Sequence, residues 1–327
     1  MQWMENDMWN LIADVGGTNM RLAEVSSGGE ILIQERFQSK GEMTLEAACA
    51  QFARERGSMP ARAVIAAAGV VKDGAVKLTN AGQSFSETSI TKTLDGAPVN
   101  VLNDFEAAAW SLATVGPDDV TTLQGAAEFP KEPCLILGPG TGLGVGALVW
   151  AGDVPCVVPG EGGHAALGPR TREEVSIFAA IREEWPEVGM GEGLLVEAEA
   201  VLSGTGLPVF YRAVAKSMEL TAPLDNAADI FSAAKARLDT AAMRAVQLFA
   251  RYLAAIAGDF GLVFGAKGGV FVTGGVAAAN PWMFDDAFVE AFNAGGRHTG
   301  WRKELPLHVY HQPDFGLIGA RNYLVHR

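Results

Sequence analysis

The residues with the clearest chemical potential lie where an apolar strand meets a helix. Residues 99–102 are strand formers, and the apolar residues of 105–112 recur at helical spacing. Asn103 and Asp104 fall at the junction. A carboxylate placed there can take a proton from a bound hydroxyl group as a general base. Because Asn and Asp are also favoured helix caps, this stretch taken alone favours a purely structural role, and only the other motifs favour the catalytic one.

Two glycine-rich turns, far apart in the chain, have the composition of phosphate-binding loops. Gly16-Gly17-Thr18-Asn19 follows Asp14 and joins two strands within residues 11–25. Gly140-Thr141-Gly142 lies in the same strand, turn and strand pattern within residues 134–150. Exposed backbone N–H groups and a hydroxyl form a concave site for phosphate oxygens. Either turn could be an ordinary hairpin, but two such turns in one chain favour nucleotide binding.

Two common nucleotide motifs do not account for these turns. Residues 142–147 fit the loose pattern G-x-G-x-x-A, but Ala147-Leu-Val-Trp150 continues as a strand where a Rossmann unit requires a helix. The sequence contains no G-x-x-x-x-G-K-[ST] P-loop. We therefore expect phosphate-binding hairpins of another kind.

A further polar set could hold a small polar ligand. Glu161 and His164 stand among glycines within residues 159–169, where the backbone can wrap tightly around a small ligand. A lone histidine is often structural, and a metal role is disfavoured because no second His or Cys stands at ligand spacing. Glu197 and Glu199 follow in residues 193–203, which we expect to be helical. Residues two apart lie about 200° apart on a helix, so we expect one of the two to be solvated.

Composition indicates a globular α/β enzyme of two domains. The chain has 327 residues, of which 49% are hydrophobic and 19% charged, with 39 Gly. Its net charge of −13 disfavours nucleic acid and anionic membranes as partners. Any anionic ligand must then be bound locally, by backbone N–H groups and a metal ion.

Cysteine usage and the apolar segments favour a soluble, cytoplasmic protein. The three cysteines lack C-x-x-C spacing, as expected in a reducing compartment. The N-terminus lacks the pattern of a signal peptide. The long apolar segment 241–264 carries Arg244, Arg251 and Asp259, which a membrane-spanning helix tolerates poorly.

These residues must be positioned by a series of strands and helices. Residues 11–37 predict a meander, and the strands at 63–68 and 99–102 should complete a first sheet with both parallel and antiparallel pairs. The remaining expected elements are helix 44–56, a turn at 73–74, strand 76–78, a polar loop at 79–82, a capped helix from Thr171 to Pro186, a central buried helix 239–264, strand 268–275 ending in Gly274 and Gly275, helix 281–293, strand 307–310 and helix 315–324.

Taken in order, six groups of residues closely resemble the bacterial glucokinase family, part of the actin-like sugar kinase and heat-shock ATPase superfamily. The match spans roughly residues 11 to 325 and is carried by Asp14–Arg21, Asn103–Phe105, Gly138–Gly144, Gly160–His164, Glu199 with Leu202–Gly204, and Gly269–Gly275.

The resemblance implies an α/β fold of two actin-like, ribonuclease H-like domains, each with a mixed central sheet, flanking a hinged cleft. The small domain would comprise residues 1–108 and the returning helix of 312–327, and the large domain residues 109–311. The resemblance also implies a homodimer that acts on a small-molecule sugar and a nucleotide. The implied activity is ATP-dependent, Mg²⁺-dependent transfer of phosphate to the 6-hydroxyl of glucose.

The same resemblance implies a role for each motif residue. Asp104 matches the catalytic base, and Asp14 matches the residue that orients Mg²⁺, through water as this ion prefers. The sugar-binding positions are Asn103, Glu161, His164 and Glu199. The ATP- and phosphate-binding positions are Asp14, Gly16, Gly17, Thr18, Asn19, Gly140, Thr141, Gly142, Gly274 and Gly275.

Two alternatives stay open. Family members usually have Pro at Gly69, Trp at Gln83 and Phe-Ala at Leu167-Gly168, all on the sugar side of the site. These departures motivate a kinase for another hexose, such as mannose, fructose or an amino sugar. A non-catalytic sugar sensor is the other alternative, although such a sensor would need neither Asp104 nor the phosphate turns.

Overall fold

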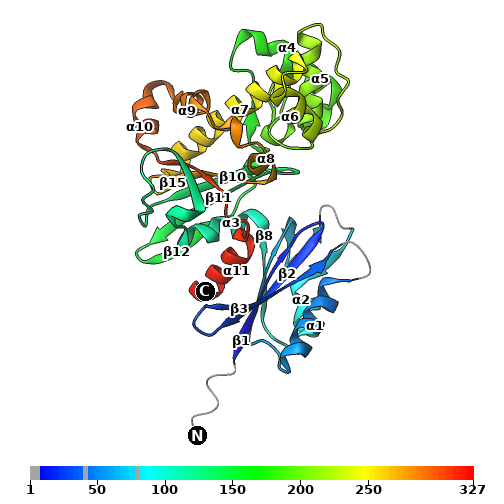
Figure 1. The fold of residues 1–327 in the computed structure, drawn as a ribbon, viewed down its shortest axis with the longest axis vertical. Coiled ribbons are helices and arrows are strands. Elements are labelled where there is room, and N and C mark those ends of the chain that lie inside the picture. The colour runs from blue at the N-terminus through cyan, green and yellow to red at the C-terminus, as the bar shows by residue number, and fades with distance from the viewer. Residues whose placement is uncertain (1–7, 40–42, 79–81) are drawn as a thin grey trace. The chain divides into compact units, whose positions relative to one another are not determined.

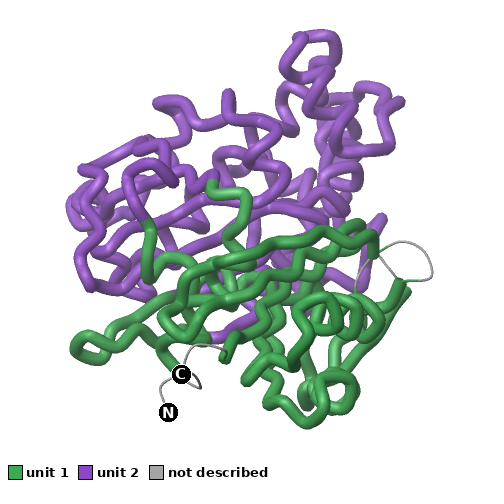
Figure 2. Tube along the Cα trace, turned by 60° about the horizontal axis from the view of Figure 1, so that its bottom comes forward, with its two compact units in different colours: residues 1–115, 148–158, 312–327 green, residues 116–147, 159–311 purple. Residues whose placement is uncertain are grey.

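The computed structural model describes residues 8–39, 43–78 and 82–327. The chain divides into two compact units, coloured separately in Figure 2. The first comprises residues up to 115 with 148–158 and 312–327, and the second comprises 116–147 and 159–311. Thus 109–115 and 148–158 group with the first unit, whereas the sequence analysis placed them in the large domain. The domain boundaries stay a prediction.

The first unit is built on a mixed sheet. Its strand order is β3-β2-β1-β4-β8, with β2 antiparallel to both neighbours and β1, β4 and β8 parallel to one another (Figure 1). The bounds are β1 Trp9–Val15, β2 Asn19–Ser26, β3 Ile31–Gln38, β4 Ala63–Ala67 and β8 Val99–Asn103. The predicted mixture of parallel and antiparallel pairs is confirmed.

Helices cover both faces of this sheet. Alternate residues of β1 separate into two cores, Leu11 packing with helices α1 and α2 and Ile12 with α3 and α11. β4 is buried along its whole length, as expected of a parallel strand covered on both faces. The helices are α1 Leu45–Arg56, α2 Glu87–Thr93, α3 Asp104–Ser111 and α11 Phe315–His326.

The predicted bounds of the helix over 44–56 agree with the structure, because capping residues stand at both of its ends. The Thr44 side chain accepts a hydrogen bond from Ala47 N, and Gly57 ends α1 at φ 70°. A small sheet of β5 Gly69–Lys72, β6 Ala75–Leu78 and β7 Ser84–Ser86 follows β4. Residues 79–81 of the predicted polar loop lie outside the described residues.

The second unit contains most of a second sheet, ordered β12-β11-β10-β15-β16-β9. β10, β15 and β16 run parallel, and β9 pairs antiparallel with β16. The bounds are β9 Val120–Gln124, β10 Cys134–Pro139, β11 Leu143–Ala151, β12 Val154–Val158, β15 Gly269–Val272 and β16 Leu307–Tyr310. Because β11 continues the chain as a strand after Gly142, the exclusion of a Rossmann unit is confirmed.

Helix α7, Thr240–Phe264, is the core of the second unit. It is long and apolar enough to cross a membrane, yet 61% of its most apolar window is buried within the protein. Phe249, Tyr252 and Leu253 lie in the main hydrophobic cluster, which identifies a core helix. The other helices are α4 Val175–Glu184, α5 Leu207–Ser217, α6 Ala227–Lys235, α8 Gly275–Ala279, α9 Asp286–Asn293 and α10 Thr299–Glu304.

The predicted helix over 281–293 is wrong in its first part. Pro281–Met283 forms a 3-10 turn, and Phe284 leaves the helical region at ψ 62°. The Asp285 side chain then accepts from Phe288 N and begins α9. The α-helix therefore begins at the Asp285 cap, inside a stretch that apolar periodicity alone predicts to be one continuous helix.

Buried His308 on β16 makes the stability of the fold depend on pH. Its Nδ1 lies 3.0 Å from the Thr122 hydroxyl, and burial lowers its pKa to about 4. The unfolded chain binds a proton at this residue below about pH 6.5, whereas the folded chain stays neutral down to about pH 4. Stability contributed by neutral His308 is therefore lost as the pH falls through this window.

We expect the free energy of unfolding to fall by about 2 kcal/mol between pH 7 and pH 5 because of His308. Urea denaturation of wild type and His308→Gln at both pH values measures this decrease in the free energy of unfolding. The decrease should be much smaller in the variant. His298→Gln, at an exposed histidine, should keep the wild-type dependence. Equal pH dependence in wild type and His308→Gln would contradict the assignment.

Candidate functional site

The first group of candidate residues lies at one edge of the first sheet. Strand register aligns Val15 with Ala67, and Ala67 with Asn103, so the carboxyl ends of β1, β4 and β8 coincide. With neighbouring strands about 4.8 Å apart, the end of β1 and the end of β8 lie roughly 10 Å apart. The structure thus brings the Asp14 turn and Asp104 to the same edge within the first unit.

A hairpin turn follows β1 directly. Gly16 N donates to Asn19 O at 3.0 Å, which closes the turn. Thr18 and Asn19 are exposed at its tip, and Gly16 and Gly17 are partly exposed. This arrangement presents backbone and a hydroxyl to solvent, as a phosphate-binding turn requires.

Asp14 is held by an arginine that the sequence analysis did not single out. Arg21 stands directly opposite Asp14 in the β1–β2 register and donates to its carboxylate. The same guanidinium donates to Asp314 and, at 3.1 Å, to Pro313 O. Burial raises the pKa of Asp14, and Arg21 opposes that rise. The charge of Arg21 therefore favours the ionised form that a water-bound Mg²⁺ would need.

Asn103 is the structural cap of α3. Its side-chain oxygen accepts from Phe105 N at 2.8 Å, and its amide donates to Gly69 O at 3.0 Å. Asp104 is the first residue of α3, partly buried, with its Oδ1 3.0 Å from Phe105 N. The cap role that the sequence left open thus belongs chiefly to Asn103.

In the second unit, the hairpin between β10 and β11 is bound to a neighbouring segment. Gly140 N donates to Gly142 O, and Gly204 N donates to Gly140 O, both at 2.8 Å. Glu199 accepts from Leu143 N at 2.7 Å. A Cβ at Gly142 would lie 2.4 Å from Glu199 Oε2, so only glycine allows this carboxylate to approach. Glu199 therefore links the candidate sugar set to the second phosphate turn.

The Glu161–His164 loop lies directly against β11. A Cβ at Gly163 would lie 2.0 Å from Leu143 O, and one at Gly162 would lie 2.8 Å from Val145. His164 N donates to Glu161 O at 3.1 Å within a 3-10 turn, and both side chains are exposed. The glycines are required by this close packing, which presents Glu161 and His164 to solvent.

Residues 196–200 do not form the expected α-helix, which corrects the sequence analysis. Val196–Glu197 is strand β14, paired with β13 (Ala166–Leu167), and Ala198–Ala200 is a 3-10 turn. Pairing with the His164 loop overrides the local helical pattern. Glu197 is consequently not a merely solvated residue, because its Oε2 lies 2.9 Å from His164 Nδ1.

Three carboxylates surround His164. The hydrogen bond with Glu197 is the main cause that raises the pKa of His164, and the charges of Glu199, Glu197 and Glu161 add to it. The structure thereby brings Glu161, His164 and Glu199 together in the second unit, with Glu197 as a fourth member. Helical spacing did not indicate that Glu197 belongs to this set. Only an expectation that residues 196–197 form a strand paired with 166–167 would have indicated it.

The turn after β15 lies next to the Gly140 turn in the second unit. Thr273 N donates to Leu137 O at 2.9 Å. Gly274 has φ 95°, and a Cβ there would lie 2.6 Å from Pro139 O, next to the Gly140 turn. Gly275 begins α8 and has open space where a Cβ would be. Backbone is therefore accessible here for a flat ligand such as a nucleoside.

The donor set fits MgATP better than a metal bound by protein ligands alone. Among the described residues, no group of three or more His, Cys, Asp or Glu side chains could hold a metal ion. Gly140 has open space around its Cα, and the Thr18 turn is exposed. Mg²⁺ commonly binds one carboxylate, water and substrate phosphates, for which Asp14 beside a phosphate turn suffices.

We expect Glu197→Gln to lower the pKa of His164, because a neutral amide no longer stabilises the imidazolium ion. His164 should then lose its proton at lower pH than in the wild type. NMR titration of the histidine side chains measures the change. Glu192→Gln, an exposed glutamate on the preceding loop, provides the control. An unchanged titration of His164 in Glu197→Gln would contradict the assigned hydrogen bond.

Proteins with similar sequences, and solved structures with a similar fold, include glucokinases. A sequence model of the glucokinase family matches residues 11–327. The glucokinase of Mesorhizobium japonicum is 35% identical over 316 residues, covering 96% of this chain and 90% of that protein. The glucokinase of Rhizobium meliloti is 36% identical over 312 residues, with 94% and 90% covered.

A solved glucokinase from an Antarctic psychrotroph superimposes with a TM-score of 0.84 at 29% identity, over 97% of this chain and 98% of that one. The expected α/β architecture of this superfamily is confirmed by that likeness. The family model and the relatives together show that this chain belongs to the glucokinase family.

Proposed function

We propose that this protein is an ATP-dependent glucokinase, which transfers the γ-phosphoryl group of MgATP to the 6-hydroxyl of glucose and releases glucose 6-phosphate and ADP. The observation that carries the proposal is the common edge of β1 and β8, where a phosphate-type turn and a carboxylate at a helix start lie at the same end of one sheet. Membership of the glucokinase family supports glucose as the acceptor.

Asp104 acts as the general base in this proposal. Its carboxylate accepts the proton of the sugar hydroxyl as the bond from that oxygen to phosphorus forms. Asn103 caps α3 and so keeps the first turn of the helix, with Asp104 in it, at the end of β8. Without the base, the hydroxyl is a poor nucleophile at neutral pH.

The sugar is bound by groups suited to hydroxyls. Asn103, Glu161, His164 and Glu199 supply an amide, carboxylates and an imidazole, and charged acceptors form strong hydrogen bonds. Glu197 orients His164 by holding Nδ1, so that Nε2 is directed to the ligand. A site built on such bonds discriminates strongly against analogues that lack a hydroxyl.

Backbone groups supply most of the binding for the nucleotide. The residues at the phosphates would be Gly16, Gly17, Thr18, Asn19, Gly140, Thr141 and Gly142, while Gly274 and Gly275 would border the nucleoside. MgATP supplies the phosphoryl group and partial neutralisation of its charge, and Asp14 would hold Mg²⁺ through water. Turnover requires that both sets of residues reach the same substrates, so we propose that the two units are the domains of a closing enzyme.

We also propose that the protein is a homodimer located in the cytoplasm. The free cysteines Cys49, Cys134 and Cys156 are consistent with a reducing compartment such as the cytoplasm, whereas the homodimer is proposed from the family resemblance alone. Sedimentation measurements on the purified protein would determine the oligomeric state.

We expect Asp104→Asn to lower kcat by about 10²–10⁴-fold, because the proton acceptor is lost while the side chain keeps its shape. A coupled assay of ADP release with glucose and MgATP measures the rate. Glu106→Gln, which removes a neighbouring carboxyl in the first turn of α3, should stay within about threefold of wild type.

Equal rates for wild type and Asp104→Asn would refute the assignment of the base. Glucose binding by calorimetry without any turnover in the wild type would instead support the sugar-sensor alternative. Binding retained by Asp104→Asn would show that the loss lies in the chemical step.

Gln83 marks where this chain departs from its family near the sugar side. Its amide donates to Ser39 O and Met43 O, each at 3.0 Å, and so links the residue that follows β3 to the residue that precedes the Thr44 cap of α1. Gly69 is equally constrained, since a Cβ there would lie 2.5 Å from Lys77 O. We infer from these contacts that the sugar site differs in shape from that of other family members, while the phosphoryl-transfer reaction is the same.

We expect glucose to have the highest kcat/KM in a panel with mannose, fructose and glucosamine. Gln83→Leu should raise the KM for glucose roughly three- to tenfold with little change in kcat, because Ser39 and Met43 lose the hydrogen bonds that link them before binding. Gln51→Leu, on the exposed side of α1, is the control. A panel led by another hexose would replace glucose as the substrate while leaving the kinase mechanism intact.

A further inference from the structure

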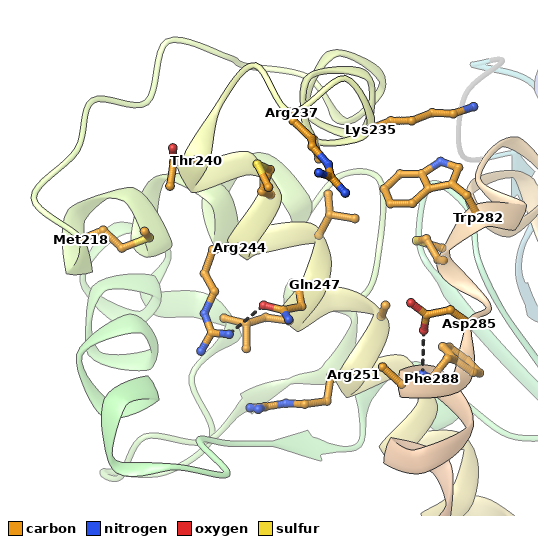
Figure 3. Close-up of a pocket in the computed structure, with 17 residues that line it drawn as sticks. Met218, Lys235, Arg237, Thr240, Arg244, Gln247, Arg251, Trp282, Asp285 and Phe288 are labelled. Carbon is orange, nitrogen blue, oxygen red and sulfur yellow. Dashed lines mark hydrogen bonds between the residues drawn. The ribbon is translucent and has the colours of Figure 1, made fainter.

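A large pocket lies in the second unit, apart from every candidate residue discussed above. It has a volume of about 770 Å³, within the usual range for small-molecule sites. We call it the α6–α7 pocket and define it by Met218, Arg237, Met243, Arg244, Arg251 and Trp282, which line it together with parts of α9 (Figure 3). Neither Gly140–Gly142 nor Gly274–Gly275 contributes to its lining.

The lining of this pocket is cationic, although the protein is acidic. Four basic side chains line it, and Asp285 is the one acidic residue among the described lining residues. The Asp285 carboxylate already caps α9 by accepting from Phe288 N at 3.0 Å. On a chain with net charge −13, such a local excess of positive charge favours an anionic ligand.

The basic side chains are not equally available. Arg251 pairs with buried Glu174. Arg244 donates to Gln247 at 2.9 Å and lies 4.0 Å from the Glu173 carboxylate. Arg237 is exposed, and its side chain has no hydrogen-bond or ion-pair partner within the described part of the chain. Figure 3 shows its guanidinium directed into the pocket, whereas Lys235 leads away from it. Arg237 is therefore the principal candidate to bind an anion.

Arg237 also occupies a backbone position that favours glycine. It follows the end of α6 with φ 58°, its N donates to Ala234 O, and Leu238 N donates to Ala233 O. Helix ends of this geometry usually carry glycine, because a Cβ is disfavoured in the left-handed region. Arg237 therefore adopts this conformation at a cost in conformational free energy.

Apolar side chains form the rest of the lining. Met218, Met243 and Trp282 are 37%, 39% and 36% exposed, unusually open for residues of this size. Methionines adapt to ligands of varied shape, and an indole ring offers a flat face for stacking. The ligand should therefore combine an anionic group with a planar apolar body.

We propose that the α6–α7 pocket is a second ligand site, which binds a small organic anion with a planar apolar body, its phosphate, sulfonate or carboxylate group held by Arg237 and its body lying against Trp282 and the methionines. This site is independent of the proposed kinase activity.

The test uses 8-anilinonaphthalene-1-sulfonate, a fluorescent anion of this class, with the full-length protein in excess MgADP and glucose. Arg237→Gly should weaken its binding at least about fivefold, because the charged partner is lost. The same change should raise Tm, because glycine relieves the left-handed backbone. Asp95→Gly, at another left-handed residue in the first unit, should raise Tm but leave binding within about twofold of wild type.

Competition distinguishes the two parts of the ligand. Trp282→Leu should also weaken dye binding, and inorganic pyrophosphate should displace the dye only weakly if the planar body contributes. Equal dye affinity in wild type, Arg237→Gly and Trp282→Leu would overturn the proposal. No dye binding to wild type, together with a change of sedimentation mass in Arg237→Glu, would overturn it as well, because a second copy of the chain would then cover the pocket.

Discussion

The candidate site of the second unit depends on glycines. At these positions two backbone segments lie closer together than a Cβ atom between them would allow. Gly163 lies against Leu143 O, and Gly274 lies against Pro139 O. Each contact fixes a loop on the sheet without a side chain between them. The result is a set of short loops held by main-chain contacts, which is how the polar side chains of Glu161 and His164 come to share one surface.

Charge in the candidate sites is organised by pairing. Arg21 holds both Asp14 and Asp314, and Glu197 holds His164. An acidic protein that binds polyphosphate needs local sources of positive potential, and exposed backbone N–H groups at glycine turns provide them without altering the net charge. The chemistry assigned to the family is thus compatible with a surface that repels nucleic acid.

The α6–α7 pocket shows a different use of positive charge. There arginine side chains, not backbone groups, face a concave apolar surface, and one of them occupies a position that costs conformational free energy. Phosphate turns suit a ligand that every member of a kinase family must bind. A pocket of arginine, methionine and tryptophan can change its specificity by substitution without disturbing the sheet that carries the chemistry.

The sequence by itself determined the elements and the family. Caps such as Thr44 and Gly57, the two glycine turns and the continuous strand after Gly142 are local patterns, so their structures follow from nearby residues. The motifs were specific enough to identify the family, because several distinct groups occur in a fixed order. The new start at Asp285 was also local, but apolar periodicity concealed it.

Only the tertiary structure decided which side chains meet. One of Glu197 and Glu199 was expected in solvent because helical spacing was assumed, whereas pairing of β14 with β13 turns Glu197 toward His164. The link from Glu199 to Leu143 N joins residues 56 apart in the chain, and the role of Arg21 depends on the position of Asp314. Long-range pairings of this kind depend on how distant segments pack, and no local propensity encodes them.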